Sequence, residues 1–340
     1  MSQRMIKAWY QSAWWLWFLW PLSILYRVIR RLLVAATTTP QTNPLPLLVV
    51  GNISLGGTGK TPVVQALVHQ LHRQGIRCGI ISRGYGGQVG KGPHLVTERD
   101  NADWVGDEPL LLTMSTDAPV VVGSDRQAAM KLLVEQFDLD MLISDDGLQN
   151  TKIKGDCEWL LIDGQRGLGN GQCLPMGPLR EPKQRLHEVD AILTTAALTD
   201  QAATTLPVTS TPTYSLRPHL VALKRVFDDQ DVSWPTSGSK VNALAGIGNP
   251  ERFFADLQTQ GLLVEGKAFT DHHRFKDEDL APFRDTTLIM TAKDRVKCKS
   301  LTSSQDQHWL YTEQGLELPE SVIEALLNKL HLDGTKKHHG

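Results

Sequence analysis

The sequence predicts an α/β fold, in which a doubly wound, mostly parallel sheet is followed by a second, smaller α/β domain. Short apolar runs alternate with helix-like segments from residue 45 to residue 194, as expected for parallel strands joined by crossover helices. A glycine-rich loop separates the first apolar run from the first helix-like segment. The same alternation returns at smaller size after residue 241.

The glycine-rich loop reads Ser54-Leu55-Gly56-Gly57-Thr58-Gly59-Lys60-Thr61, between the expected strand 45–50 and the expected helix 61–74. This order predicts a P-loop NTPase-like phosphate cradle. Backbone N–H groups and the helix N-terminus face the anion, Lys60 reaches the outer phosphates of ATP, and Thr61 offers its hydroxyl to Mg²⁺. Ser54 stands where the first glycine of G-x-x-x-x-G-K-[ST] is expected, which leaves the chemistry of Lys60 and Thr61 whole.

The remaining elements follow in the same alternating order. In the first domain they are strand 79–82, helix 107–116, strand 120–122, helix 125–137 and strands 141–144, 159–162 and 191–194. In the second they are strand 241–245, helix 250–260, strand 288–291 and helix 319–330. The predicted organisation is a membrane-associated helix over 1–35, a P-loop domain over 36–212, an extended linker over 213–235, a smaller α/β domain over 236–332 and a tail over 333–340.

Polar residues follow two of the expected strands. Asp145 and Asp146 end strand 141–144, and an acid at the carboxyl edge of a strand downstream of a P-loop predicts a Mg²⁺ site, direct or through water. Arg83 and Tyr85 end strand 79–82, where α/β folds place their ligands. A flexible turn with an incidental Arg is the alternative there. The long loop 164–182 is of a length that is usually functional.

Two segments offer a base for phosphoryl transfer, which needs a group that deprotonates the acceptor hydroxyl. Asp107 opens a helix, and His272 follows an acid at the start of a loop in the second domain. Each has a plainer alternative, Asp107 as a helix cap and His272 as part of an exposed loop. If the two domains close around the P-loop, this carboxylate and imidazole from opposite walls would act together.

The N-terminus carries five of the nine tryptophans within its first 20 residues, in a charge-free stretch from Ala8 to Tyr26. Its length is near the roughly 20 residues that span a bilayer, but Trp prefers the headgroup level and Pro21 interrupts the helix. We therefore expect the segment to lie in the membrane interface. Spanning the bilayer and packing on the protein's own core are the alternatives.

The charge of the chain is divided unevenly. The first 97 residues contain no Asp or Glu and carry +10, whereas the remainder carries −12, for a net charge of −2. A basic half indicates an anionic partner, either nucleotide phosphates or acidic lipid, and the lack of interleaved aromatics outside the Trp-rich segment argues against nucleic acid. The four cysteines lack C-x-x-C spacing, which predicts neither a zinc site nor a disulfide framework and fits the cytosol.

Taken together, these motifs resemble the tetraacyldisaccharide 4′-kinase family, the lipid A 4′-kinases of Gram-negative bacteria. The resemblance spans nearly the whole chain in one order. Beyond the Trp-rich segment and the P-loop, it rests on Ser82-Arg83-Gly84-Tyr85-Gly86, Gly106-Asp107-Glu108-Pro109, Asp145-Asp146-Gly147-Leu148-Gln149, Leu179-Arg180-Glu181-Pro182, Gly246-Ile247-Gly248-Asn249-Pro250, Arg252-Phe253-Phe254, Asp271-His272 and Thr291-Ala292-Lys293-Asp294. Met176 and Ala292 depart from the residues that the family often has, Ala and Glu.

The resemblance implies ATP-dependent phosphorylation of the 4′-hydroxyl of a tetraacylated glucosamine disaccharide 1-phosphate, an anionic glycolipid, at the cytoplasmic face of the inner membrane. It implies that Asp107 and His272 form the catalytic pair with Lys60 at the phosphates. It further implies that Thr61, Asp145, Asp146 and Glu181 serve Mg²⁺, and that Arg83, Tyr85 and Arg180 line the acceptor side. No obligate protein partner is evident. A membrane-recruited P-loop switch ATPase is the alternative function.

Overall fold

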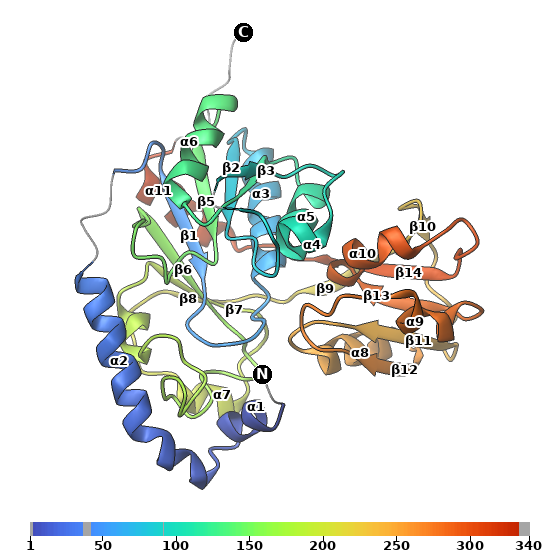
Figure 1. Cartoon of the computed structure of the whole chain (residues 1–340), viewed down its shortest axis with the longest axis horizontal. Coiled ribbons are helices and arrows are strands. Elements are labelled where there is room, and N and C mark those ends of the chain that lie inside the picture. The colour runs from blue at the N-terminus through green and yellow to red at the C-terminus, as the bar shows by residue number, and fades with distance from the viewer. Residues whose placement is uncertain (1–2, 37–41, 91, 333–340) are drawn as a thin grey trace.

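The computed structural model describes residues 3–36, 42–90 and 92–332, and in this part of the chain the strands form two sheets (Figure 1). Lys91 and the predicted tail 333–340 lie outside the described residues. The α/β class and the mostly parallel sheet predicted from the sequence are confirmed. The ends of the expected strands and helices lie within about two residues of the observed ends. Apolar periodicity predicts that an element exists more reliably than it predicts where the element ends.

The larger sheet has eight strands in the order β3-β4-β2-β5-β1-β6-β7-β8, and only the β3–β4 pair is antiparallel. The P-loop strand therefore lies near the centre, between β5 and β6. The strands are β1 (Leu47–Gly51), β2 (Cys78–Ser82), β3 (His94–Leu95), β4 (Val120–Val122), β5 (Met141–Asp145), β6 (Cys157–Ile162), β7 (Ala191–Thr194) and β8 (Thr213–Ser215). Because the inner strands are buried on both faces, they read as continuous apolar runs rather than alternating ones.

Helices cover both faces of this sheet. One face packs against α3 (Lys60–Arg73), α5 (Asp107–Ser115) and α11 (Glu320–Leu330), and the other against α6 (Arg126–Gln136) and the segment 148–189. Shorter helices lie in the connections: α4 (Ala102–Val105), η2 (Lys183–His187) and α7 (Asp200–Thr205).

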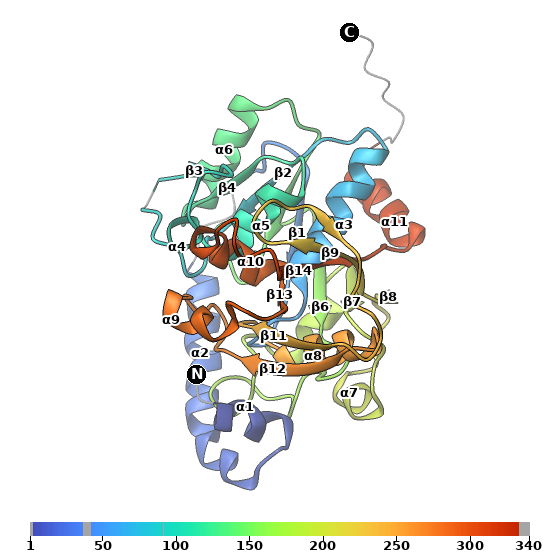
Figure 2. The same ribbon diagram turned by 90° about the vertical axis from the view of Figure 1, so that its right-hand side faces the viewer.

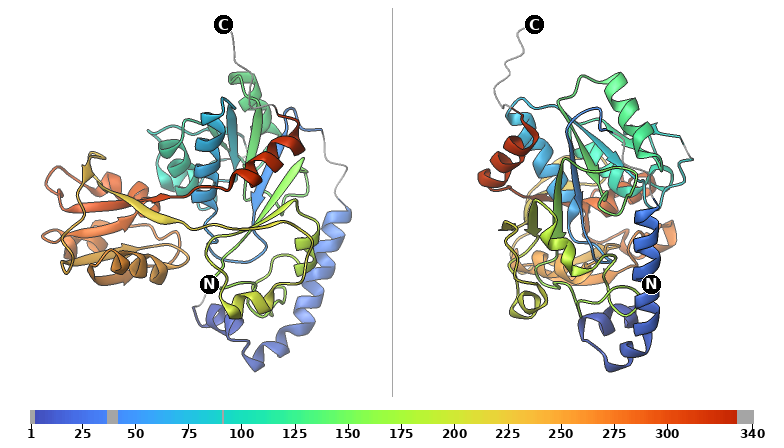
Figure 3. Two further views of the ribbon diagram at one scale, coloured as in Figure 1. Left: turned by 180° about the vertical axis from the view of Figure 1, so that it is seen from behind. Right: turned by 90° about the vertical axis from the view of Figure 1, so that its left-hand side faces the viewer.

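The C-terminal helix α11 packs with the larger sheet, although the sequence grouped helix 319–330 with the smaller domain. Val322, Ile323 and Leu326 are buried in the same core as Trp159 of β6 and Leu48 of β1. Figure 3 shows this helix lying back across the larger sheet, behind the view of Figure 1. An amphipathic stripe tells which face of a helix is buried but not which core receives it.

The smaller sheet has six strands in the order β10-β9-β14-β13-β11-β12. Its strands are β9 (His219–Arg225), β10 (Asp231–Val232), β11 (Lys240–Ala245), β12 (Leu263–Ala268), β13 (Leu288–Thr291) and β14 (Trp309–Gly315), and its helical elements are α8 (Pro250–Thr259), α9 (Asp277–Leu280), η3 (Ala281–Phe283), α10 (Ala292–Cys298) and η4 (Lys299–Leu301). The segment 213–235, expected as an extended linker, is extended but contributes β8 to one sheet and β9 and β10 to the other.

The chain crosses between the two sheets twice, once from β8 to β9 and once from β14 to α11 (Figure 2). Helix α10 lies between the two parts, against α5 of the larger one. Arg295 of α10 donates a hydrogen bond to the sulfur of Met114, and Val296 joins the core of the larger sheet. The two sheets are therefore held at a shared interface rather than by a linker alone.

The N-terminal segment forms α1 (Gln3–Tyr10), η1 (Trp14–Leu19) and α2 (Trp20–Ala35), and Pro21 lies in the first turn of α2, where its missing N–H costs little. Trp9 and Leu16 are buried, and the indole of Trp9 donates to the carbonyl oxygen of Pro175 at 3.0 Å. In contrast, Trp14 is 73% exposed and Phe18 76%. One side of this segment packs on the protein, and the other presents aromatic and aliphatic side chains to the surroundings.

Helix α2 has 16 residues and is about 24 Å long at 1.5 Å per residue. Within the described residues, no helix combines the length and the apolar character that crossing a bilayer requires.

Candidate active site

Side-chain hydrogen bonds from within the segment fix the conformation of the P-loop. The side-chain amide of Asn52 donates to the carbonyl oxygens of Ser54 and Gly56, at 2.9 and 3.3 Å. Gly59 has φ +76° and caps helix α3, a conformation that a residue with a Cβ adopts at a cost. These contacts take up two carbonyl oxygens of the loop, and the N–H group of Leu55 donates to the carbonyl oxygen of Pro178 at 2.8 Å. The N–H groups that can face an anion are therefore those after Leu55, toward the N-terminus of α3.

Lys60 lies beside the acids that end β5. Its Nζ is 3.4 Å from Oδ1 of Asp146, and the guanidinium of Arg180 is 3.2 Å from Oδ2 of the same carboxylate. Burial alone would raise the pKa of Asp146, but Lys60 and Arg180 hold it below its usual value. Arg180 also donates to Gln149. The structure therefore brings Arg180, predicted for the acceptor side, to the phosphate side as well.

Asp145 is fully buried, and neither of its carboxylate oxygens has a hydrogen-bond partner among the described residues. Burial raises the pKa of Asp145 to about 7, with Glu108 and Asp146 adding to the rise and Lys60 opposing it. Thr58 Oγ1 is likewise buried without a partner. A buried carboxylate with free oxygens beside a phosphate cradle fits a hard divalent cation, because Mg²⁺ prefers oxygen ligands.

Glu181 lies apart from this acid pair. One of its oxygens accepts from Gln149 at 2.7 Å and faces Arg30 of α2 at 3.4 Å, and the other faces Arg185 at 3.6 Å. Across the described chain, no three His, Cys, Asp or Glu side chains converge on a common metal site. Asp145 and the P-loop residue Thr61 could hold a Mg²⁺ ion only together with nucleotide phosphates and water, the mixed coordination that this ion ordinarily takes.

Asp107 and His272 meet across the domain interface. Nδ1 of His272 lies 3.0 Å from both carboxylate oxygens of Asp107. Burial alone would raise the pKa of Asp107, but His272 and Lys293 lower it to about 2. The carboxylate therefore adds to stability above its usual pKa, and this contribution is lost as the pH falls through about 2. The N-cap of α5 is Gly106, so Asp107 is not the cap that the plainer alternative supposed.

Two residues of the site, His272 and Asp146, have a left-handed backbone conformation. His272 has φ +59°, and Asp146 on the opposite side of the site has φ +53°. Left-handed backbone is uncommon for residues other than glycine, and such conformations gather at functional sites.

Tyr85 lies on His272, with ring centroids 5.2 Å apart and an interplanar angle of 61°. Its loop is pressed against the end of α4, just before α5, since a Cβ on Gly87 would come within 2.5 Å of the carbonyl oxygen of Trp104. Glycine at that position is what brings Tyr85 to the catalytic candidates. Arg83 is exposed at the base of the same loop.

The two domains also touch at the P-loop itself. A Cβ on Gly248, in the loop after β11, would lie 2.7 Å from the backbone nitrogen of Gly57. Arg166 spans the same junction, donating to the carbonyl oxygen of Gly248 at 3.0 Å. Sequence reasoning assigned no role to Arg166, Gln149 or Lys293. Their significance comes from partners far away in the chain, which residue spacing does not reveal.

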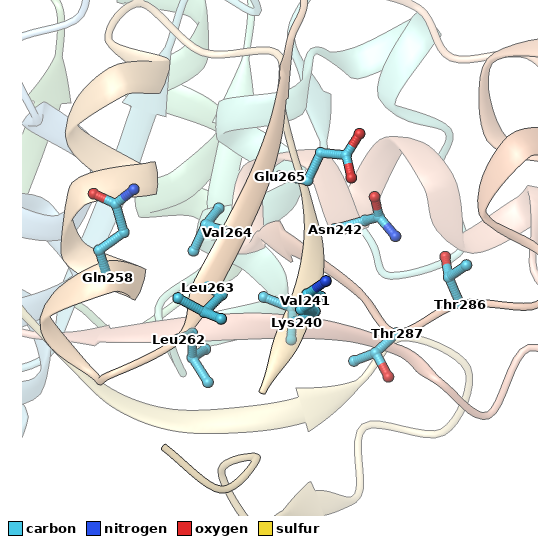
Figure 4. A pocket seen from close by; sticks show the side chains of 10 residues that line it. All are labelled: Lys240, Val241, Asn242, Gln258, Leu262, Leu263, Val264, Glu265, Thr286 and Thr287. Carbon is cyan, nitrogen blue, oxygen red and sulfur yellow. The ribbon is translucent and has the colours of Figure 1, made fainter. Parts of the chain in front are cut away.

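A hollow of about 830 Å³ lies elsewhere on the smaller domain. It is lined by the first residues of β11 and β12 and by Thr286 and Thr287 before β13 (Figure 4). His272 and Lys293 follow β12 and β13 at the opposite, carboxyl ends of the strands, where α/β folds bind their ligands. The hollow is therefore separate from the site described above.

Comparisons with known proteins point to one family. The model of the tetraacyldisaccharide-1-P 4′-kinase family, LpxK, matches residues 15–331. A tetraacyldisaccharide 4′-kinase of Pseudomonas fluorescens (strain SBW25) is 39% identical over 326 residues, 95% of this chain and 94% of the relative. One of Stutzerimonas stutzeri (strain A1501) is 41% identical over 308 residues, 88% of this chain and 89% of the relative. The crystal structure of LpxK from Aquifex aeolicus in complex with ATP is similar with a TM-score of 0.75 and 27% identity, covering 93% of this chain and 99% of that one.

Proposed function

The chain belongs to the family of tetraacyldisaccharide-1-P 4′-kinases, and from this premise we propose how its residues divide the work of phosphoryl transfer. The activity is ATP-dependent phosphorylation of the 4′-hydroxyl of a tetraacylated disaccharide 1-phosphate in lipid A biosynthesis. The observation that carries the division of roles is the contact of Asp107 with His272 beside the P-loop.

The donor side holds the phosphates of ATP. Backbone N–H groups of residues 56–59 bind phosphate oxygens, and Lys60, released from Asp146, neutralises the charge on the transferred group. Arg180 is the second cation within reach of this position. Asp145 and Thr61 would hold Mg²⁺, with Asp146 acting through water and Glu181 orienting Gln149, Arg30 and Arg185. When bound, the ion would offset the negative charge of the phosphates.

The acceptor side removes a proton. Asp107 accepts from Nδ1–H of His272, which leaves Nε2 of the imidazole as the base for the 4′-hydroxyl. The hydroxyl oxygen then bonds to the γ-phosphorus, the bond between the γ-phosphorus and the β–γ bridging oxygen breaks, and ADP leaves. Tyr85 and Arg83 line the acceptor beside this pair. Since Asp107 and His272 come from different domains, the base exists only when the domains meet.

The N-terminal segment would bring this site to its substrate. Its exposed apolar side chains suit the headgroup and acyl boundary, and Arg27 and Arg31 of α2 suit anionic headgroups, whereas Arg30 faces Glu181. We assign it a place in the interface at the cytoplasmic face of the inner membrane. Tyr26 and Ser23 of α2 donate to the carbonyl oxygens of Arg180 and Cys173. The membrane-facing helix thus rests on the loop that carries the donor-side cation.

Incubation with ATP and a tetraacylated disaccharide 1-phosphate, followed by mass measurement of the lipid, tests this function. The expected product is heavier by one phosphoryl group at the 4′ position, and ATP consumption depends on the lipid. ATP hydrolysis at an equal rate without the acceptor, with no change in lipid mass, would favour the switch ATPase instead.

A further inference from the structure

Lys293 lies at the centre of the acceptor side, although no sequence motif assigned it a role. It is the second residue of α10, and its side chain is only 15% exposed. Its Nζ donates to Glu108 at 3.0 Å and to Asp271 at 3.5 Å, and it lies 3.5 Å from Nε2 of His272. The three N–H bonds of the ammonium thus have three acceptors, on both domains.

We propose that Lys293 is a positioning residue that fixes His272 as the neutral tautomer with its proton on Nδ1 and its lone pair on Nε2. The proposal rests on the proposed role of His272 as the base. An ammonium group has donors only, so the nitrogen that faces it must present a lone pair. On the other side of the ring, the Asp107 carboxylate only accepts, and Nδ1 must therefore carry the proton.

The charges around His272 show why such a residue is needed. Asp107 and Glu108 of α5 and Asp271 of the same loop are all acids, and Nε2 is 3.8 Å from Asp271. A ring with both nitrogens protonated cannot accept the hydroxyl proton, and a cation 3.5 Å from Nε2 opposes a proton there. Lys293 and Lys297 of α10 are the cations on the facing side, and the uncharged ring of Tyr85 covers the imidazole.

The ammonium group of Lys293 also stays protonated. Burial alone would lower the pKa of its ammonium, but Glu108, Asp107 and Asp271 raise it above its usual value. A cation that stays protonated across the working pH range can oppose the imidazolium at every pH where the enzyme acts.

Nitrogen-15 NMR of protein labelled at histidine tests the tautomer without reference to activity. The His272 signals are identified by their loss in His272→Gln. We expect the wild type at pH 7.5 to show a protonated Nδ1 and an unprotonated Nε2, and Lys293→Met to show both nitrogens protonated at the same pH. A protonated Nε2 in the wild type, or an unchanged ring in Lys293→Met, would overturn the proposal.

The pH profile of kcat gives the second readout. With Lys293→Met, we expect the acidic limb of the kcat profile to move to higher pH by about one unit. This is at the low end of the shift that one nearby charge causes, because the imidazole ring of His272 is partly exposed. Lys293→Arg keeps the charge and should keep the limb in place. Lys299→Met, an exposed lysine just after α10 that pairs with Asp229, is the matched control and should change nothing.

A uniform loss of turnover in Lys293→Met with no movement of the limb would mean that the residue is merely structural, and would contradict the proposal. If the Met variant does not fold, as judged by circular dichroism, Lys293→Gln takes its place with the same expectation. Normal turnover in His272→Ala would instead remove the proposed base role, while the NMR result on the tautomer would still decide the role of Lys293.

Discussion

The two sides of the site are built in different ways. The donor side, from the P-loop to Asp145 and Asp146, comes from neighbouring strands of one sheet and is complete within one domain. The acceptor side is assembled from Asp107 on the larger domain and from His272 and Lys293 on the smaller one. With the proposed roles, nucleotide binding needs only one domain, whereas proton removal depends on how the two domains meet.

The largest effect is expected from the acceptor side. Asp107→Ala and His272→Ala should each lower kcat by about 10³-fold, because general-base catalysis typically contributes 10²–10⁴-fold. ATP affinity should change by less than about threefold, since neither residue touches the cradle. Steady-state kinetics and nucleotide titration check both statements. A large loss of ATP affinity in either variant would erase the distinction between the two sides.

Gly248→Ala tests whether the domains must approach closely. The added methyl group would lie 2.7 Å from the backbone nitrogen of Gly57, so one domain has to move. We expect kcat to fall by about 10- to 100-fold, the cost of a displacement on the order of 1 Å, with unchanged thermal stability. Gly92→Ala is the control, because nothing lies within 4 Å of its Cβ position. Equal kinetics for the two variants would show that the contact is dispensable.

Asp145→Asn tests the donor side through stability. Since burial raises the pKa of Asp145 to about 7, the metal-free protein loses stability as the pH rises from the usual carboxyl value toward 7. At pH 8 the variant should therefore be more stable than the wild type by about 2 kcal/mol, the order of cost of an unpaired buried group. At pH 4 the gain should be small.

Urea denaturation at the two pH values, without nucleotide or Mg²⁺, measures this difference. Asp138→Asn, whose side chain is 82% exposed, is the control and should show no pH-dependent gain. A variant that is destabilised at pH 8 would show that Asp145 has a partner in the native protein.

Substitutions in the N-terminal segment are expected to have the smallest effect on catalysis. Trp17→Ser and Phe18→Ser should each weaken binding to anionic vesicles by about 10-fold, because burying such a side chain in an apolar medium is worth about 1.5–3 kcal/mol. Turnover on detergent-dispersed acceptor should stay within about twofold. Phe227→Ser, an exposed aromatic of the smaller domain, is the control in vesicle sedimentation. Unchanged sedimentation of both N-terminal variants would contradict the interfacial assignment.

The parts of this account that the sequence could predict are those coded by neighbouring residues. Strand β1, the P-loop and helix α3 are consecutive, so apolar periodicity and glycine spacing reveal them together. Strand β12 was missed because its residues, Leu263 to Ala268, form an edge strand with charged side chains and a central glycine. Strand β14 was missed because its apolar half, Trp309 to Tyr311, is too short to stand out.

Site residues that act through contacts with distant parts of the chain could not be predicted from the sequence. Asp107 and His272 were candidate bases from their sequence context, and the resemblance implied that they form a pair. Lys293 and Arg166 act through partners on the other domain, and no spacing along the chain encodes those pairs. The same holds for the placement of α11 on the larger sheet. An apolar helix face predicts that the helix packs on a core, but only the three-dimensional fold shows which core.

A double-mutant cycle on kcat, with Asp107→Asn, His272→Gln and the two combined, tests most directly whether the acceptor side works as one unit across the domain interface. Residues that act as a unit are strongly non-additive, because removing either already removes the shared function. The account predicts that the double variant is about as slow as the slower single variant, within about threefold. Losses that multiply in the double variant would show that the two residues act independently, and would contradict a base built from both domains.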